Sequence, residues 1–267
     1  LSFKSPKSLG SIIPSTSVSH AVFGKLNGDD ILYTSVNGAP AVFNVYNITK
    51  EELVSSHSMS MAKNVWCHII NPVNEKVYII GTGNLYEYDP LTDSMTDLGD
   101  FSSTEGASFT ANVDENGNIY IGTSTNAKII KYDIIEKKFV DLGSVKDGAS
   151  YVRSLNYHKG YLYAGIKGDG YVEFYKIDVS DFSKKEEIPL PVSGDYSMDM
   201  LSSVNWIYGG TVVGDKIALY VPCETKYILL VYDTEKNEFV NTGYNGGFKG
   251  LYTTPLKDSK SYFIGDG

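Results

Sequence analysis

Eight polar or aromatic side chains recur at two fixed distances before a repeated strand. The position ten residues before that strand's central residue holds His68, Thr110, Arg153 and Tyr208 in successive repeats. The position twelve residues before it holds Trp66, Ser108, Tyr151 and Trp206. Both tryptophans of the chain, its only arginine and one of its four histidines fall in this set. A planar guanidinium grips a carboxylate or sulfate with two hydrogen bonds, and an indole ring offers an apolar face to a sugar. The set therefore predicts a ligand-binding site for an acidic sugar.

The same residues could support catalysis by β-elimination on a uronate. Arg153 would neutralise the carboxylate and so acidify the C5 proton, while His68 or Tyr208 would act as general base and the other as acid. The sequence contains no nucleophile elbow, phosphate-binding loop, HExxH segment or cysteine-rich metal motif. No cofactor and no metal site are predicted.

A four-stranded unit that recurs about every 44 residues must position these side chains. Its third strand closes on an aromatic or aliphatic residue followed by Asp or Asn, with spacings of 42, 44, 45 and 55 residues between Asn47, Asp89, Asp133, Asp178 and Asp233. Its second strand is centred on Tyr33, Tyr78, Tyr120, Tyr163, Ala218 and Phe263. Leu-Gly or Thr-Gly ends the unit, as at Leu98-Gly99 and Leu142-Gly143. Short strands with this period are typical of the blades of a β-propeller.

The predicted fold is all-β, with four antiparallel strands in each blade. The third unit shows them at 106–113, 118–124, 127–133 and 138–145, with a hairpin turn at Asp114–Gly117. A single domain over 1–267 is expected, with five whole blades at 17–60, 61–105, 106–148, 149–193 and 194–245.

The ends of the chain predict a split sixth blade that closes the ring. Residues 1–16 would supply its outer strand and 246–267 its inner strands, which would protect the ring edges. A fragment of a seven-bladed propeller is the alternative. The fifth blade is longer, with an insertion expected at Ser193–Ser203. Because the chain begins at Leu1 and shows no signal peptide, it is expected to be trimmed or processed.

The first strand of each blade should line the axis, with alternate residues facing it. The eight residues would face the channel, and Cys67, Phe109, Val152 and Ile207 between them would pack between blades. Two structural alternatives stay open. Large aromatic side chains also fill the axis of a propeller, and a carboxylate such as Asp199 or Glu105 could pair with Arg153, since a buried unpaired guanidinium is costly.

Composition excludes several classes of partner. The net charge of −9 argues against nucleic-acid binding, and no apolar run is long enough to span a bilayer. Two cysteines, Cys67 and Cys223, are too few for a disulfide framework and are expected to be free thiols.

The segment IYIGTSTNAKIIKYDIIEKKFVDLG resembles blades of bacterial secreted propellers of the NHL and YVTN type. Some relatives in that group are lyases that act on uronate polymers or streptogramins, with active residues on inner strands at one face. The resemblance implies a secreted or cell-surface location and attachment to a larger multidomain chain. It favours an extracellular carbohydrate-binding propeller, with a polysaccharide or other small polar ligand as partner. A polysaccharide lyase and a protein–protein interaction scaffold are the alternatives.

Overall fold

The computed structural model describes residues 17–191, 206–223 and 226–240, and these contain only strands and connections. Twenty strands form five successive units of four. The first strands are β1 (Ser17–Leu26), β5 (Cys67–Ile70), β9 (Ala107–Val113), β13 (Ala149–His158) and β17 (Gly209–Val213). The second strands are β2 (Asp29–Asn37), β6 (Val77–Ile80), β10 (Ile119–Ser124), β14 (Tyr161–Gly168) and β18 (Lys216–Cys223).

The outer half of each unit also has two strands. The third strands are β3 (Ala41–Asn47), β7 (Asn84–Asp89), β11 (Lys128–Asp133), β15 (Tyr171–Asp178) and β19 (Lys226–Asp233). The fourth strands are β4 (Glu52–Met59), β8 (Ser94–Asp100), β12 (Lys138–Ser144), β16 (Lys185–Ile188) and β20 (Glu238–Val240). Each unit is an antiparallel meander, and one bridge between Ser124 and Tyr151 joins the third sheet to the fourth. The predicted four-stranded antiparallel blades are confirmed.

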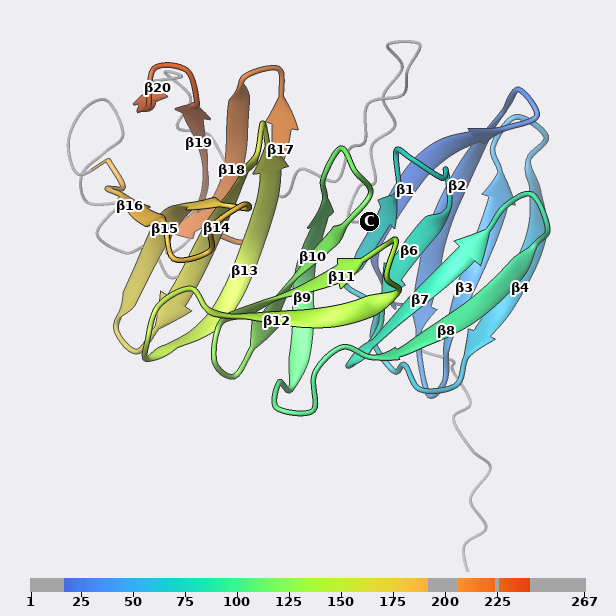
Figure 1. Ribbon diagram of the computed structural model, residues 1–267. Coiled ribbons are helices and arrows are strands. Elements are labelled where there is room, and N and C mark those ends of the chain that lie inside the picture. Colours follow the sequence, from blue (N-terminus) through green and yellow to red (C-terminus); the bar gives the residue numbers. More distant parts are fainter. Residues whose placement is uncertain (1–16, 192–205, 224–225, 241–267) are drawn as a thin grey trace, which may run out of the picture.

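The first strands lie next to one another in chain order. β1 contacts β5, β5 contacts β9, β9 contacts β13, and β13 contacts β17. Figure 1 shows the five sheets following one another from the blue first sheet to the orange fifth. The predicted closing segments 1–16 and 246–267 and the predicted insertion all lie outside the described residues, so the number of blades stays a prediction. Within the described ranges, no helix is long and apolar enough to cross a membrane.

The Asp or Asn that closes each third strand holds the turn into the fourth. Asp133 Oδ1 accepts hydrogen bonds from the backbone N–H groups of Ile135 and Glu136, and Asp233 Oδ1 accepts the equivalent pair. Asp89 and Asp178 each accept a hydrogen bond from the backbone N–H two residues onward. A short acidic side chain that bonds two residues onward favours a turn over a continued strand. This repeat position is therefore structural.

The hydrophobic cores lie between successive blades. Tyr33 of β2 packs against Tyr88 of β7 in the next blade, with ring centroids 6.0 Å apart. Tyr78 meets Tyr132 at 6.5 Å, and Tyr163 meets Tyr232 at 5.9 Å, in the same relation. All six tyrosines are buried. The two sequence anchors of the repeat are thus the two halves of one contact between blades.

Glycines in the second strands let the next blade approach closely. A Cβ built on Gly122 of β10 would lie 2.6 Å from Val152 Cγ1 of β13, and one on Gly165 of β14 would lie 2.7 Å from Ile207 Cβ. Both neighbouring side chains are fully buried in the cores, so they have little space to yield.

We expect Gly122→Ala to lower the free energy of unfolding by about 1–3 kcal/mol, because an added methyl group overpacks the contact with Val152. Gly209→Ala is the matched control, since its added Cβ meets nothing within 4 Å and its backbone is not left-handed. Urea denaturation of both variants measures the difference. Equal stability of the two variants would contradict the close-approach role of Gly122.

Candidate functional site

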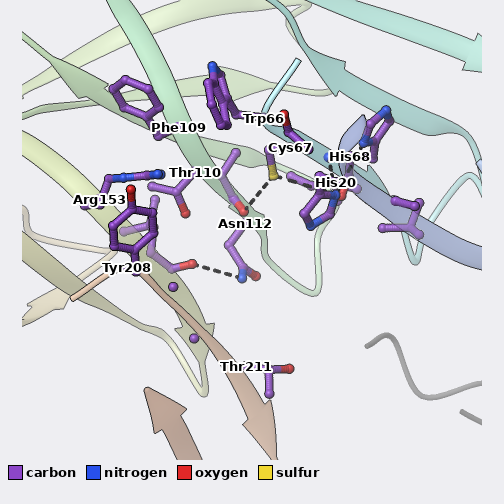
Figure 2. A pocket seen from close by; sticks show the side chains of 18 of the residues that line it. His20, Trp66, Cys67, His68, Phe109, Thr110, Asn112, Arg153, Tyr208 and Thr211 are labelled. Atoms are coloured by element: carbon purple, nitrogen blue, oxygen red, sulfur yellow. Dashed lines mark hydrogen bonds between the residues drawn. The ribbon is translucent and has the colours of Figure 1, made fainter. Parts of the chain in front are cut away.

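A cavity of about 340 Å³ lies where the five first strands meet, and each of β1, β5, β9, β13 and β17 contributes to its lining. Figure 2 shows Trp66, Phe109, Arg153 and Tyr208 on one side of it and His20 and His68 on the opposite side. Thr110, Asn112 and Thr211 add polar groups, and the Asn112 amide donates to the Leu155 carbonyl. The cavity is therefore aromatic and cationic on one side and imidazole-lined on the other.

Arg153 enters the cavity because it stands at a β-bulge. In the pairing of β13 with β14, Val152 faces Ile166 and Ser154 faces Gly165, which leaves Arg153 as the extra residue. Phe109 is the extra residue of β9 in the same way, between Thr110 and Ser108. A bulge bends its strand and re-aims the side chain that has no cross-strand partner.

The Arg153 guanidinium lies among aromatic rings. Its Cζ is 4.5 Å from the centroid of Phe109, 4.3 Å from that of Tyr208 and 5.9 Å from that of Trp66. The negative ring faces attract the cation, which partly offsets the loss of water from the half-buried group. Figure 2 shows the guanidinium beside the Tyr208 ring.

No carboxylate within the described part of the chain forms an ion pair or hydrogen bond with Arg153. Glu105, one predicted partner, instead accepts hydrogen bonds from the third blade. It accepts hydrogen bonds from the Thr123 hydroxyl at 2.7 Å and from the backbone and side-chain nitrogens of Asn126. Asp199, the other predicted partner, lies outside the described residues. The guanidinium thus keeps its donors available toward the cavity.

His68 belongs to a hydrogen-bond network between the first two blades. The rings of His20 and His68 stack with centroids 5.5 Å apart and planes 13° apart, and their Nδ1 atoms are separated by 3.3 Å. His20 Nδ1 also accepts the backbone N–H of His68, and His68 Nε2 lies 2.8 Å from Ser35 Oγ. All these bonds form when His68 Nδ1–H donates to His20 and the Ser35 hydroxyl donates to His68. Both histidines are then neutral.

This network does not support the predicted general-base role of His68. The side chain is 2% exposed and both ring nitrogens have protein partners, so neither is free to take a proton from a ligand. Ser35 resembles an activated nucleophile beside a base, but it is 1% exposed and does not line the cavity. Cys67 is a free cysteine that lines the cavity, and burial raises the pKa of its thiol to about 12. It is therefore not a thiolate nucleophile.

The other predicted site residues divide into two groups. Trp66, Thr110, Arg153 and Tyr208 line the cavity. Ser108 does not, because it is buried and its hydroxyl donates to the Gly122 carbonyl at 2.8 Å. Tyr151 and Trp206 do not line the cavity either, but they form a half-buried aromatic surface next to it. Their ring centroids are 5.2 Å apart, and the Trp206 ring lies 6.2 Å from that of Tyr208.

Simple alternation along the first strands missed several lining residues. Cys67, which was predicted to pack between blades, also lines the cavity. The prediction that Phe109 packs only between blades is wrong, since its ring faces the cavity and Arg153. His20 also lines the cavity, next to an irregularity in β1 between Val18 and Ala21. The second strands of the three middle sheets, β6, β10 and β14, are buried on both faces, so side chains on the first strands beside them alternate between the preceding and the following blade. A bulge shifts that phase by one residue, and the sequence carries no clear signal for where it falls.

The comparisons with known proteins bear on the fold. No protein-family model matches the chain, and no curated protein matches it. A chain from the crystal structure of a nidogen–laminin complex superimposes with a TM-score of 0.61 at 10% sequence identity, covering 86% of this chain and 80% of that chain. Hydrazine synthase of Kuenenia stuttgartiensis gives 0.59 at 12% identity, covering 90% and 67%.

These similarities, together with the consecutive four-stranded sheets, show that the chain is a β-propeller. At 10% and 12% sequence identity these similarities are evidence for the fold and not for a function. The predicted fold class is confirmed, and so is the propeller part of the predicted resemblance.

The histidine pair predicts a loss of stability in mild acid. Burial lowers the pKa of His20 to about 4, and burial and the neighbouring His20 lower the pKa of His68 well below its ordinary value of 6.5. As the pH falls, the histidines of the unfolded chain therefore take up protons before those of the folded protein. The contribution of the two histidines to the free energy of unfolding is complete above pH 6.5 and is lost as the pH falls toward about 4. We expect the double variant His20→Gln, His68→Gln to show a shallower fall of unfolding free energy between these pH values.

His158→Gln serves as the control for that experiment, because His158 lies at a hairpin far along the chain and contacts Asp215. Denaturant titrations at a series of pH values give the slopes. If the unfolding free energy of the double variant falls with pH as steeply as that of the unmodified protein, the two histidines are not held neutral by the fold.

Proposed function

We propose that this propeller binds an acidic carbohydrate in its axial cavity. The observation that carries the proposal is the Arg153 guanidinium, which faces the cavity between Phe109 and Tyr208 and has no carboxylate partner among the described residues. An unpaired guanidinium in a protein of net charge −9 is best explained by an anion that the ligand supplies.

The groups around Arg153 suit a sugar in particular. Trp66 and Phe109 give flat apolar surface for a pyranose face, with their centroids 5.5 Å apart. The hydroxyls of Thr110 and Tyr208 have no hydrogen-bond partner within the described ranges, so they are available to sugar hydroxyls. The aromatic rings also hold the guanidinium in place, which reduces the entropy lost on binding.

Binding is better supported than β-elimination. A lyase needs a general base within reach of the C5 proton, and the ring nitrogens of His68 are both occupied. Tyr208 is the one predicted acid–base residue whose functional group remains available. The proposal includes a secreted or cell-surface location and a polysaccharide as the natural source of the ligand, in keeping with the resemblance to secreted bacterial propellers. Membership of a larger multidomain chain belongs to the same proposal.

Titration of tryptophan fluorescence with galacturonate and with galactose tests the proposal, because Trp66 lies beside the Arg153 fork. We expect the acidic sugar to bind and the neutral sugar to bind at least tenfold more weakly. Arg153→Gln should weaken galacturonate binding by about tenfold or more, as expected for loss of a charge-assisted bidentate pair. Arg153→Lys keeps the charge without the planar fork, so its affinity for galacturonate should lie between that of the unmodified protein and that of Arg153→Gln.

Equal affinity for both sugars, or unchanged binding by Arg153→Gln, would overturn the proposal. The appearance of ultraviolet absorbance from unsaturated products on polygalacturonate would instead establish the lyase.

An interaction scaffold is the second candidate, because one of the similar folds comes from a complex of two proteins, nidogen and laminin. A scaffold makes no use of an unpaired guanidinium in the axial cavity. It therefore predicts no uronate binding by either the unmodified protein or Arg153→Gln, which the same titration distinguishes.

A further inference from the structure

A second cation rests on the aromatic surface beside the cavity. The Lys167 Nζ atom lies 4.0 Å from the centroid of the Trp206 ring. That ring is 6.2 Å from the ring of Tyr208, whose face Arg153 covers. Lys167 belongs to β14 and stands opposite Tyr151 in the pairing with β13. Arg153 and Lys167 are thus held on neighbouring rings, one in the cavity and one at its side.

Lys167 has neither an ion pair nor a hydrogen bond within the part of the chain that the structure describes. Other lysines of the sheets do have carboxylate partners. Lys76 lies 2.7 Å from Glu87, and Lys128 lies 2.7 Å from Asp141. In a chain with 32 acidic residues and 23 basic ones, a lysine and an arginine that both lack a carboxylate partner among the described residues, on two neighbouring rings, are an unusual placement. Both cations instead lie over aromatic rings.

We infer that Lys167 recognises a second anionic group and that the ligand is an acidic oligosaccharide with charges on successive sugar units. This inference rests on the proposed function of the cavity. One sugar would occupy the cavity, with its carboxylate on Arg153. The next would lie over Trp206 and Tyr151, with its carboxylate on Lys167. The apolar faces of both sugars would then meet aromatic rings while both carboxylates meet cations.

The alternative role of Lys167 is structural, as a cation that stabilises the Trp206 ring. Lys176 offers a comparison for this role, because its Nζ atom lies 4.4 Å from the centroid of Tyr161. Tyr161 and Lys176 belong to β14 and β15 and are not part of the cavity lining. Substitution at Lys176 therefore removes a similar cation–ring contact without touching the proposed site.

Calorimetric titration with monogalacturonate and with digalacturonate tests the inference. We expect the unmodified protein to bind the dimer about five- to tenfold more tightly than the monomer, as one additional charge-assisted contact would give. Lys167→Met should remove this preference and leave the affinity for the monomer unchanged. Lys167→Arg should retain the preference, and Lys176→Met should behave as the unmodified protein.

The outcomes separate this inference from the proposed function. If monogalacturonate binds and the dimer binds no more tightly, the second subsite is wrong and the cavity site stands. The same conclusion follows if Lys167→Met weakens both ligands equally, or if Lys176→Met abolishes the preference as well. If the unmodified protein binds neither ligand, both the cavity site and its extension are overturned.

Discussion

The contact between a second-strand tyrosine of one blade and a third-strand tyrosine of the next is the interaction on which the rest of the structure depends. It occurs as Tyr33 with Tyr88, Tyr78 with Tyr132, and Tyr163 with Tyr232. A four-stranded sheet has two faces to bury, and at these three junctions the contact lets one blade cover a face of the next. Between the third and fourth blades the third-strand position is Ile177, which shares a core with Tyr120. The residue that follows the third-strand tyrosine caps the next turn. Two consecutive residues, the third-strand tyrosine and the aspartate after it, therefore fix the packing between blades and the turn into the fourth strand.

The cavity depends on local departures from that regular pattern. Without bulges, Phe109 and Arg153 would continue the alternation between the preceding and the following blade. One extra residue in β9 and one in β13 direct these side chains to the axis instead. On the other side of the cavity, Ser35, His20 and His68 form hydrogen bonds with one another. The polar groups of that wall therefore have protein partners, whereas the opposite wall holds a cation without a protein anion among the described residues.

The sequence predicted the blades well because its repeated residues are the ones that pack and turn. The strands expected at 118–124 and 138–145 were found at Ile119–Ser124 and Lys138–Ser144. It predicted Arg153, Tyr208, Trp66 and Thr110 as lining residues, since these lie on first strands or directly before them. It could not give the burial of Ser108 or the pairing of His68 with His20, because both depend on bulges and on contacts between distant strands.

A bulge residue has no cross-strand partner, and this has a consequence for how the protein changes over generations. Arg153 occupies such a position, whereas Tyr163 and Gly165 on the adjacent strand maintain the spacing between blades. Selection for a new ligand and selection for stability therefore act on different residues. A lineage could exchange the axial side chain for one of another charge while the ring of blades kept its shape.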